Sequence, residues 1–157
     1  MTAKANEMDA QLDAYVSGKR EMHQILEMSA EQLQALRGRA QFFFDGEHDE
    51  RALIMLEMLE ELDRTDARPT FMAIDVLLRM GHSDAAKAKV QALAARHPSS
   101  ADALIARAQV ELALGEWANA AKTLGEVAKR DPSAKSEAGK LGRALAARAY
   151  ATFEANR

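Results

Sequence analysis

The sequence predicts an all-α fold made of repeated helical hairpins, and three observations lead to that prediction. The 157 residues are rich in Ala, Leu, Glu, Lys, Arg and Met, which are good helix formers, and include only 3 Pro. Apolar residues recur at helical spacing in successive segments. Glycine, alanine and proline also recur 34 residues apart, in the pairs Gly81 and Gly115, Ala86 and Ala120, and Pro98 and Pro132.

Each recurring residue has a physical role in a helical hairpin. Glycine permits the left-handed turn between two helices, alanine lets the second helix approach its neighbour, and proline ends that helix. A period of 34 with these residues at fixed offsets is the signature of a tetratricopeptide repeat, a helix–turn–helix unit. We therefore expect a right-handed tetratricopeptide-repeat superhelix of three repeats over residues 29–157, closed by a C-terminal capping helix.

Residues 1–28 do not match the repeat and form an N-terminal helical extension. The first six residues are polar, and we expect them to be disordered. A helix is predicted over 7–17 from the spacing of its apolar residues, with Gly18 as its stop, and a short segment follows over 20–27. The apolar stripe of this extension could dock on the first repeat or on another subunit.

The first repeat begins at Ser29, which opens a capping box with Gln32. Helices are predicted over 30–44 and 49–62, with Gly46 turning the chain between them. Gly46 stands six residues before the alanine of its repeat, whereas the later glycines stand five before theirs. The first turn is therefore one residue longer than the others.

In the later repeats, Asp66 and Ser83 are the expected helix caps, and Ser99-Ser100 starts the third repeat. We expect Trp117, two residues after a turn glycine, to pack in the core. The final segment carries the large–small pair Leu141-Gly142 of a repeat's first helix, and it resembles the polar cap that helical solenoids require. The expected helices cover 67–80, 84–96, 101–114, 117–130 and, as the cap, 133–155.

The first helix of each pair lines the concave side of such a superhelix. The phase of the repeats then predicts an apolar floor with hydrogen-bonding groups, which suits an extended peptide with apolar anchors. The alternative is that Phe71, Met72 and Ile105 are ordinary inter-helix core and that the groove is nearly flat. The predicted groove residues are Arg37, Gln41, Phe44, Phe71, Met72, Asp75, Leu78, Ile105, Gln109 and Leu112.

Other classes of function find no support in the sequence. A net charge of −3 argues against a nucleic-acid surface, and the absence of Cys removes thiolate metal sites and disulfides. No apolar run reaches the roughly 20 residues that span a bilayer. The 4 His form no pair at i, i+4, and the glycines never cluster as in a phosphate-binding loop. We expect a soluble intracellular protein with no catalytic residues, metal or cofactor.

The layout resembles one particular group of repeat proteins. An N-terminal helix containing LDAYVSG (12–18) is followed by three repeats, the first with EQLQAL (31–36) and ending in LDRTDAR (62–68). This order is similar to the class II chaperones of bacterial type III secretion systems, which hold the hydrophobic translocator proteins. The resemblance covers nearly the whole chain.

That resemblance implies a cytoplasmic chaperone that keeps a membrane-active export substrate soluble before secretion, without catalysis and without membrane insertion. In that family an extended segment of the translocator lies in the concave groove. By position, the groove would include Arg37, Gln41, Phe44, Phe71, Met72, Leu78 and Ile105. The family's N-terminal helices often mediate homodimers, which would make Leu12, Tyr15 and Val16 the candidate dimer interface.

Two other functions stay open at this point. A general tetratricopeptide adaptor or scaffold subunit would have a permanent partner and would recognise a short, charged tail. A regulatory subunit of an enzyme is also compatible with the sequence, although no residue requires it.

Overall fold

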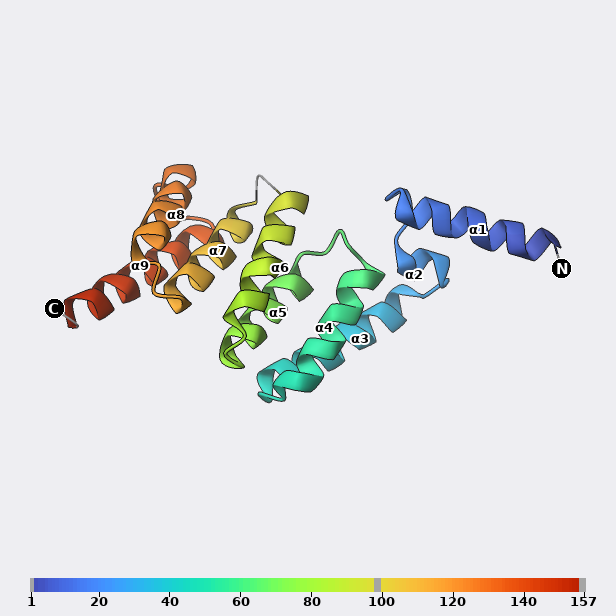
Figure 1. Cartoon of the computed structure of the whole chain (residues 1–157), viewed down its shortest axis with the longest axis horizontal. Coiled ribbons are helices and arrows are strands. Elements are labelled where there is room, and N and C mark those ends of the chain that lie inside the picture. Colours follow the sequence, from blue (N-terminus) through green and yellow to red (C-terminus); the bar gives the residue numbers. More distant parts are fainter. Residues whose placement is uncertain (1, 98–99, 156–157) are drawn as a thin grey trace. The chain divides into compact units, whose positions relative to one another are not determined.

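The computed structural model describes residues 2–97 and 100–155, and within these ranges it contains helices and no strand (Figure 1). The all-α, helical-repeat prediction is therefore confirmed. Pro98 and Ser99, which we expected to end one repeat and begin the next, lie outside the described residues. The helices are α1 (Thr2–Val16), α2 (Met22–Ile25), α3 (Ala30–Asp45), α4 (Asp49–Leu62), α5 (Arg68–Arg79), α6 (Ser83–Arg96), α7 (Ala101–Ala113), α8 (Trp117–Arg130) and α9 (Glu137–Ala155).

The chain divides into two compact units, residues 1–76 and 77–157. The first unit contains α1 to α4 and most of α5. The second contains the end of α5 and α6 to α9. The division into an extension over 1–28 and a repeat domain over 29–157 stays a prediction.

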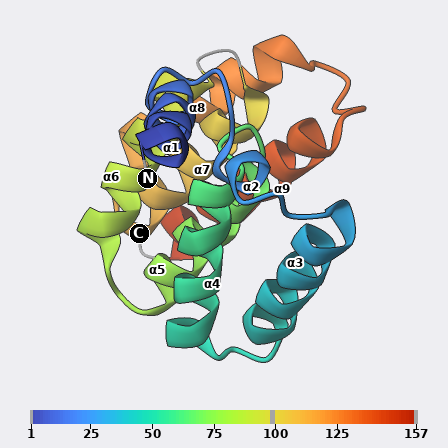
Figure 2. The same cartoon turned by 90° about the vertical axis from the view of Figure 1, so that its right-hand side faces the viewer.

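The first unit is centred on the hairpin of α3 and α4, which pack side by side (Figure 2). The predicted capping box is present, because the Ser29 side chain accepts from the backbone N–H of Gln32 and the Gln32 side chain accepts from that of Ser29. The buried apolar face of α4 repeats every three or four residues, at Ala52, Leu56 and Leu59. This spacing is why α4 is helical and why it lies against α3.

The turn between α3 and α4 corrects one prediction. Gly46 has φ −82°, an ordinary right-handed value, and Glu47 takes the left-handed position with φ 54°. In the later repeats the left-handed residues are Gly81 and Gly115, with φ 77° and 72°. Glu47 stands five residues before Ala52, the same offset that these glycines keep from their alanines. The extra residue thus moves the glycine out of register and leaves Glu47 in the strained position.

The N-terminal segment is more ordered than predicted, since α1 begins at Thr2 rather than at residue 7. Its last turn is held by Tyr15, whose hydroxyl donates to Glu61 Oε2 at 2.6 Å. The Arg64 guanidinium lies over the Tyr15 ring, 3.9 Å from its centroid, and Arg64 Nη2 donates to the Tyr15 carbonyl at 2.7 Å. Three contacts therefore anchor the end of α1 to the end of α4 and the residues just after it.

In the second unit, α7 packs against α6, α8 and α9, and α8 packs against α9. Helices α7, α8 and α9 together form one buried cluster, made of Ile105, Ala108, Leu124, Val127 and Leu145. The N-cap of α7 is Ser100, one of the two serines expected to start the third repeat. The prediction for Ser83 is wrong, because it is the first residue of α6 and His82 holds the N-cap position without a side-chain bond.

None of the helices in the described ranges combines the length and the apolar character needed to cross a bilayer. In the same ranges, no three His, Asp or Glu side chains gather closely enough to hold a metal ion.

Candidate peptide-binding site

A small cavity of about 90 Å³ in the first unit brings together several of the predicted groove residues. Arg37 and Gln41 reach it from α3, and Met72 reaches it from the first half of α5. Apolar side chains and polar groups thus meet at one place, as recognition of a peptide requires. The remaining lining residues are Ala40, Leu56, Leu59, Asp66, Arg68 and Pro69.

The charges around this cavity are paired within the chain. Arg37 Nη2 donates to Asp63 Oδ2 at 3.0 Å and lies 3.1 Å from Asp66 Oδ2. Arg68 also binds Asp66, with its Nη2 2.7 Å from Oδ2. The hydrogen bond from the Arg68 side chain lowers the pKa of Asp66 below its ordinary value, and the charge of Arg37 acts in the same direction. The cavity therefore presents guanidinium groups that carboxylates already neutralise.

Arg37 keeps one unused hydrogen-bonding group. Its Nε is buried and has no hydrogen-bond partner among the described residues. Gln41 is engaged on the surface, since its Nε2 donates to Asp45 Oδ1 at 2.7 Å, one helical turn away. A bond of this kind between two exposed side chains is weak and exchanges readily with another partner.

The other predicted groove residues of the first unit are Phe44, Phe71 and Asp75, and all three are half-buried. Phe44 contrasts with Phe42 on the same helix, whose side chain is 67% exposed. Phe71 and Met72 are not fully enclosed in the core, because both retain exposed surface. The alternative that they are ordinary core residues therefore does not hold for these two positions.

In the second unit, Leu78, Gln109 and Leu112 are half-buried, but Ile105 is only 4% exposed. Ile105 belongs to the core cluster, and Leu112 packs against that cluster. Ile105 is buried because α9 packs closely over it at Gly142, where an added Cβ would lie 3.3 Å from Ile105 Cδ1. The absence of a side chain there lets α9 cover Ile105, so the expectation that Ile105 lies on an open floor is wrong for this structure.

The three candidate interface residues of α1 fall into two groups. Leu12 and Val16 are 43% and 80% exposed, and Met8 on the same stripe is 52% exposed. Tyr15 is engaged within its own chain by Glu61 and Arg64. An interface with another subunit stays a prediction, and Leu12 and Val16 are the residues available for it.

A cavity in the second unit was not predicted. It measures about 700 Å³ and lies between α8 and α9, with Trp117 and Tyr150 among its lining residues. Trp117 is 38% exposed, so the expectation that it packs in the core is wrong. A signal for this cavity exists in the sequence, because Ala121, Gly125 and Ala128 form a row of small residues at helical spacing.

The comparisons with known proteins agree with this architecture. Residues 71–136 match the family model described as "Tetratricopeptide repeat". No curated protein is similar enough in sequence to be matched.

Among the solved structures that resemble the chain are the following three. The Yersinia enterocolitica type III secretion translocator chaperone SycD superposes with a TM-score of 0.69 at 22% identity, covering 82% of this chain and 98% of SycD. A chain of a type III secretion complex from Aeromonas hydrophila gives a TM-score of 0.74 at 16% identity and covers 94% of this chain and 97% of its own. The first tetratricopeptide domain of Spaghetti (RPAP3), bound to the HSP90 peptide SRMEEVD, gives 0.59 at 16% identity and covers 75% of this chain and 96% of its own. The chain thus contains tetratricopeptide repeats and shares its fold with a type III secretion translocator chaperone.

Proposed function

We propose that the chain is a cytoplasmic chaperone that binds an extended segment of a hydrophobic type III secretion translocator and keeps it soluble before export. The observation that carries the proposal is the similarity to SycD, which spans 98% of that chaperone. Covering an apolar segment prevents its aggregation by itself, so this role needs no catalysis and no cofactor. We further propose that the chain self-associates through the exposed stripe of α1.

The cavity of the first unit supports an apolar client more than an acidic one. Its apolar lining offers a seat for a small side chain, and Met72 can adapt to different occupants. The guanidinium groups of Arg37 and Arg68 already face Asp63 and Asp66. A carboxylate-bearing peptide would have to compete with these two aspartates, whereas a peptide carbonyl needs only a single free donor.

The second candidate is an adaptor that recognises an acidic tail. It is favoured by the likeness to the RPAP3 domain, which was solved with the acidic peptide SRMEEVD. Titration with that peptide separates the two functions. We expect no saturable binding, and saturable binding that Arg37→Met removes would favour the adaptor.

The direct test is co-expression with the products of neighbouring genes that encode long hydrophobic segments, followed by affinity purification. The variant Phe44→Ala should raise the dissociation constant of the captured client about tenfold, because it removes an aromatic anchor. Phe42→Ala is the matched control: it lies on the same helix but about 200° away around the axis, and it should bind as the wild type does. Equal binding by both variants would remove Phe44 from the site.

A substitution at Ile105, in the second unit, would test stability rather than binding. Because Ile105 is buried, Ile105→Asp should unfold the second unit rather than report on binding. Phe71 is half-buried, so Phe71→Ala can be used to test binding if circular dichroism shows that its helicity is unchanged.

A further inference from the structure

An open groove runs between α8 and α9, over the cavity of about 700 Å³ described above. Its floor is made largely of Ala and Gly, and Ala118, Ala121, Gly125, Ala128 and Ala146 all retain exposed surface. Small side chains allow the backbone of another helix to approach closely. The shape of the groove is therefore suited to binding a helix.

The repeat pattern explains why this groove is open. In the second unit, α6 packs against α7 and α8 packs against α9, so each return helix contacts the first helix of the next repeat. The described residues contain no return helix after α9. Within the described residues, α9 therefore lacks the hairpin partner that a return helix would supply, and the groove beside it is open.

The same chain carries a helix whose apolar stripe is exposed to solvent. Met8, Leu12 and Val16 follow one another at i, i+4 and i+8 on α1, and all three are exposed. The last turn of α1 is anchored through Tyr15. A helix of 15 residues is marginal on its own in water, so a packing surface for this stripe would stabilise it.

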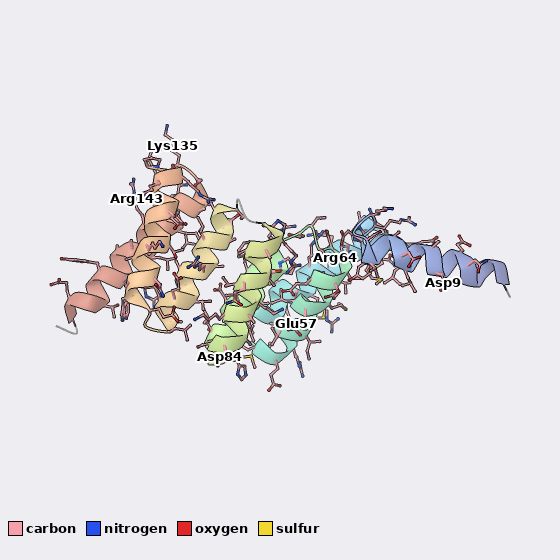
Figure 3. The ribbon with its side chains drawn as sticks, turned by 45° about the horizontal axis from the view of Figure 1, so that its top comes forward. Asp9, Glu57, Arg64, Asp84, Lys135 and Arg143 are labelled. Atoms are coloured by element: carbon pink, nitrogen blue, oxygen red, sulfur yellow. The ribbon has the colours of Figure 1, made fainter. Side chains whose placement is uncertain are left out.

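The charges of the two surfaces are complementary. Helix α1 has three acidic residues and one basic residue, for a net charge of −2, and Asp9 and Asp13 flank its apolar stripe. Residues 117–155 have seven Lys or Arg and four Asp or Glu, for a net charge of +3. Arg143 and Asp131 are the charged residues in the lining of the groove, and Lys122 and Lys129 are exposed elsewhere on α8. Asp9 on α1 and Arg143 on α9 are labelled in Figure 3.

We infer that the groove between α8 and α9 receives α1 of a second copy of this chain. This inference rests on the proposed self-association and names the surface that accepts the helix. The stripe of Met8, Leu12 and Val16 lies on the Ala and Gly floor, and the aspartates beside the stripe are attracted by Arg143 and by the net positive charge of residues 117–155. The contact joins two different surfaces, so it differs from a symmetric contact between two α1 helices.

Two variants separate the two surfaces. The helix variant combines Met8→Asp with Leu12→Asp and leaves the groove intact. The groove variant is Gly125→Leu; a Cβ at Gly125 meets nothing within 4 Å, so leucine fills the groove without disturbing the fold. The matched control is Gly38→Leu, at another exposed helical glycine with open space around it.

Sedimentation equilibrium gives the first readout. The wild type and Gly38→Leu should self-associate, and each of the two surface variants should raise the dissociation constant at least about tenfold. Circular dichroism checks that both variants keep their helices. A wild type that stays a single chain at every concentration, or a groove variant that associates normally, would overturn the inference.

Mixing the two variants gives the second readout. The helix variant still has its groove and the groove variant still has its α1, so the mixture should form pairs of twice the single-chain mass. A symmetric contact between α1 helices would instead let the groove variant, whose α1 is intact, pair with itself and would leave out the helix variant, which would contradict the inference. Gly125→Leu should also retain the wild-type affinity for the translocator, so a failure of self-association is distinguishable from a failure of client binding.

Discussion

Glu47 illustrates how one additional residue changes the strain in a turn. The left-handed backbone at φ 54° suits glycine, and it costs about 1–2 kcal/mol for a residue with a Cβ. Gly46 stands beside this position and cannot relieve it. The first turn therefore holds strain that the turns at Gly81 and Gly115 avoid.

The first prediction follows from that strain. Glu47→Gly should raise the free energy of unfolding by up to about 1 kcal/mol, measured by urea denaturation. Gly81→Ala, which introduces a Cβ at φ 77°, should lower it by a similar amount. If both variants shift the midpoint in the same direction, the assignment of strain to Glu47 is wrong.

The burial of Ile105 could not be predicted from the sequence. Phe71 and Ile105 stand 34 residues apart and share one phase of the repeat, yet Phe71 is half-buried and Ile105 is in the core. The difference lies in Gly142, whose missing side chain lets α9 approach. Phase predicts the direction in which a side chain points from its own helix, but not how closely the next helix packs over it.

At the scale of single helices, the start of α9 depends on Asp131. Its carboxylate accepts from the backbone N–H of Lys135 and of Ser136, and from the Ser136 hydroxyl. The hydrogen bonds from Ser136 are the main cause of the low pKa of Asp131, about 2. Because this pKa lies below that of the unfolded chain, near 3.8, ionised Asp131 stabilises the folded state at pH values above about 4.

The second prediction uses that pH window. Asp131→Asn should be less stable than the wild type between pH 5 and about 7, and the difference should shrink as the pH falls from about 4 to 2. Urea denaturation at each pH gives the comparison. A difference that stays constant down to pH 2 would show that Asp131 acts through its shape rather than through its charge.

Helices were the most predictable part of the chain. Capping residues such as Ser29 and Ser100, and the 34-residue spacing of glycine and alanine, set most boundaries within a few residues. The start of α1 at Thr2 was missed because its first residues are polar and show no apolar period. The groove between α8 and α9 was missed because Trp117, which lines it, was expected to pack in the core.

For the molecule as a whole, the buried core starts late in the sequence. No residue from 6 to 28 is buried, and the first buried apolar side chain is Leu33. The N-terminal segment is instead attached by polar contacts such as Tyr15 to Glu61 and His23 Nδ1 to the Leu62 carbonyl, at 2.7 Å. The repeats therefore have their core without it.

The third prediction is that a chain of residues 29–157 folds but no longer self-associates. It keeps Ser29, so the cap of α3 is retained. Its helical signal should fall only by the share of α1 and α2, and its sedimentation mass should be that of one chain at all concentrations. Loss of cooperative unfolding would show that the extension belongs to the core, and retained association would place the self-contact elsewhere.

Trp117 lies in the wall of the groove between α8 and α9, and it is the only tryptophan in the chain. Its fluorescence therefore comes from that groove alone, with an indole that is partly in contact with water. When a helix settles beside the indole and excludes this water, the emission shifts to shorter wavelength. The protein thus carries its own optical probe of groove occupancy, which needs no label and can be read during dilution.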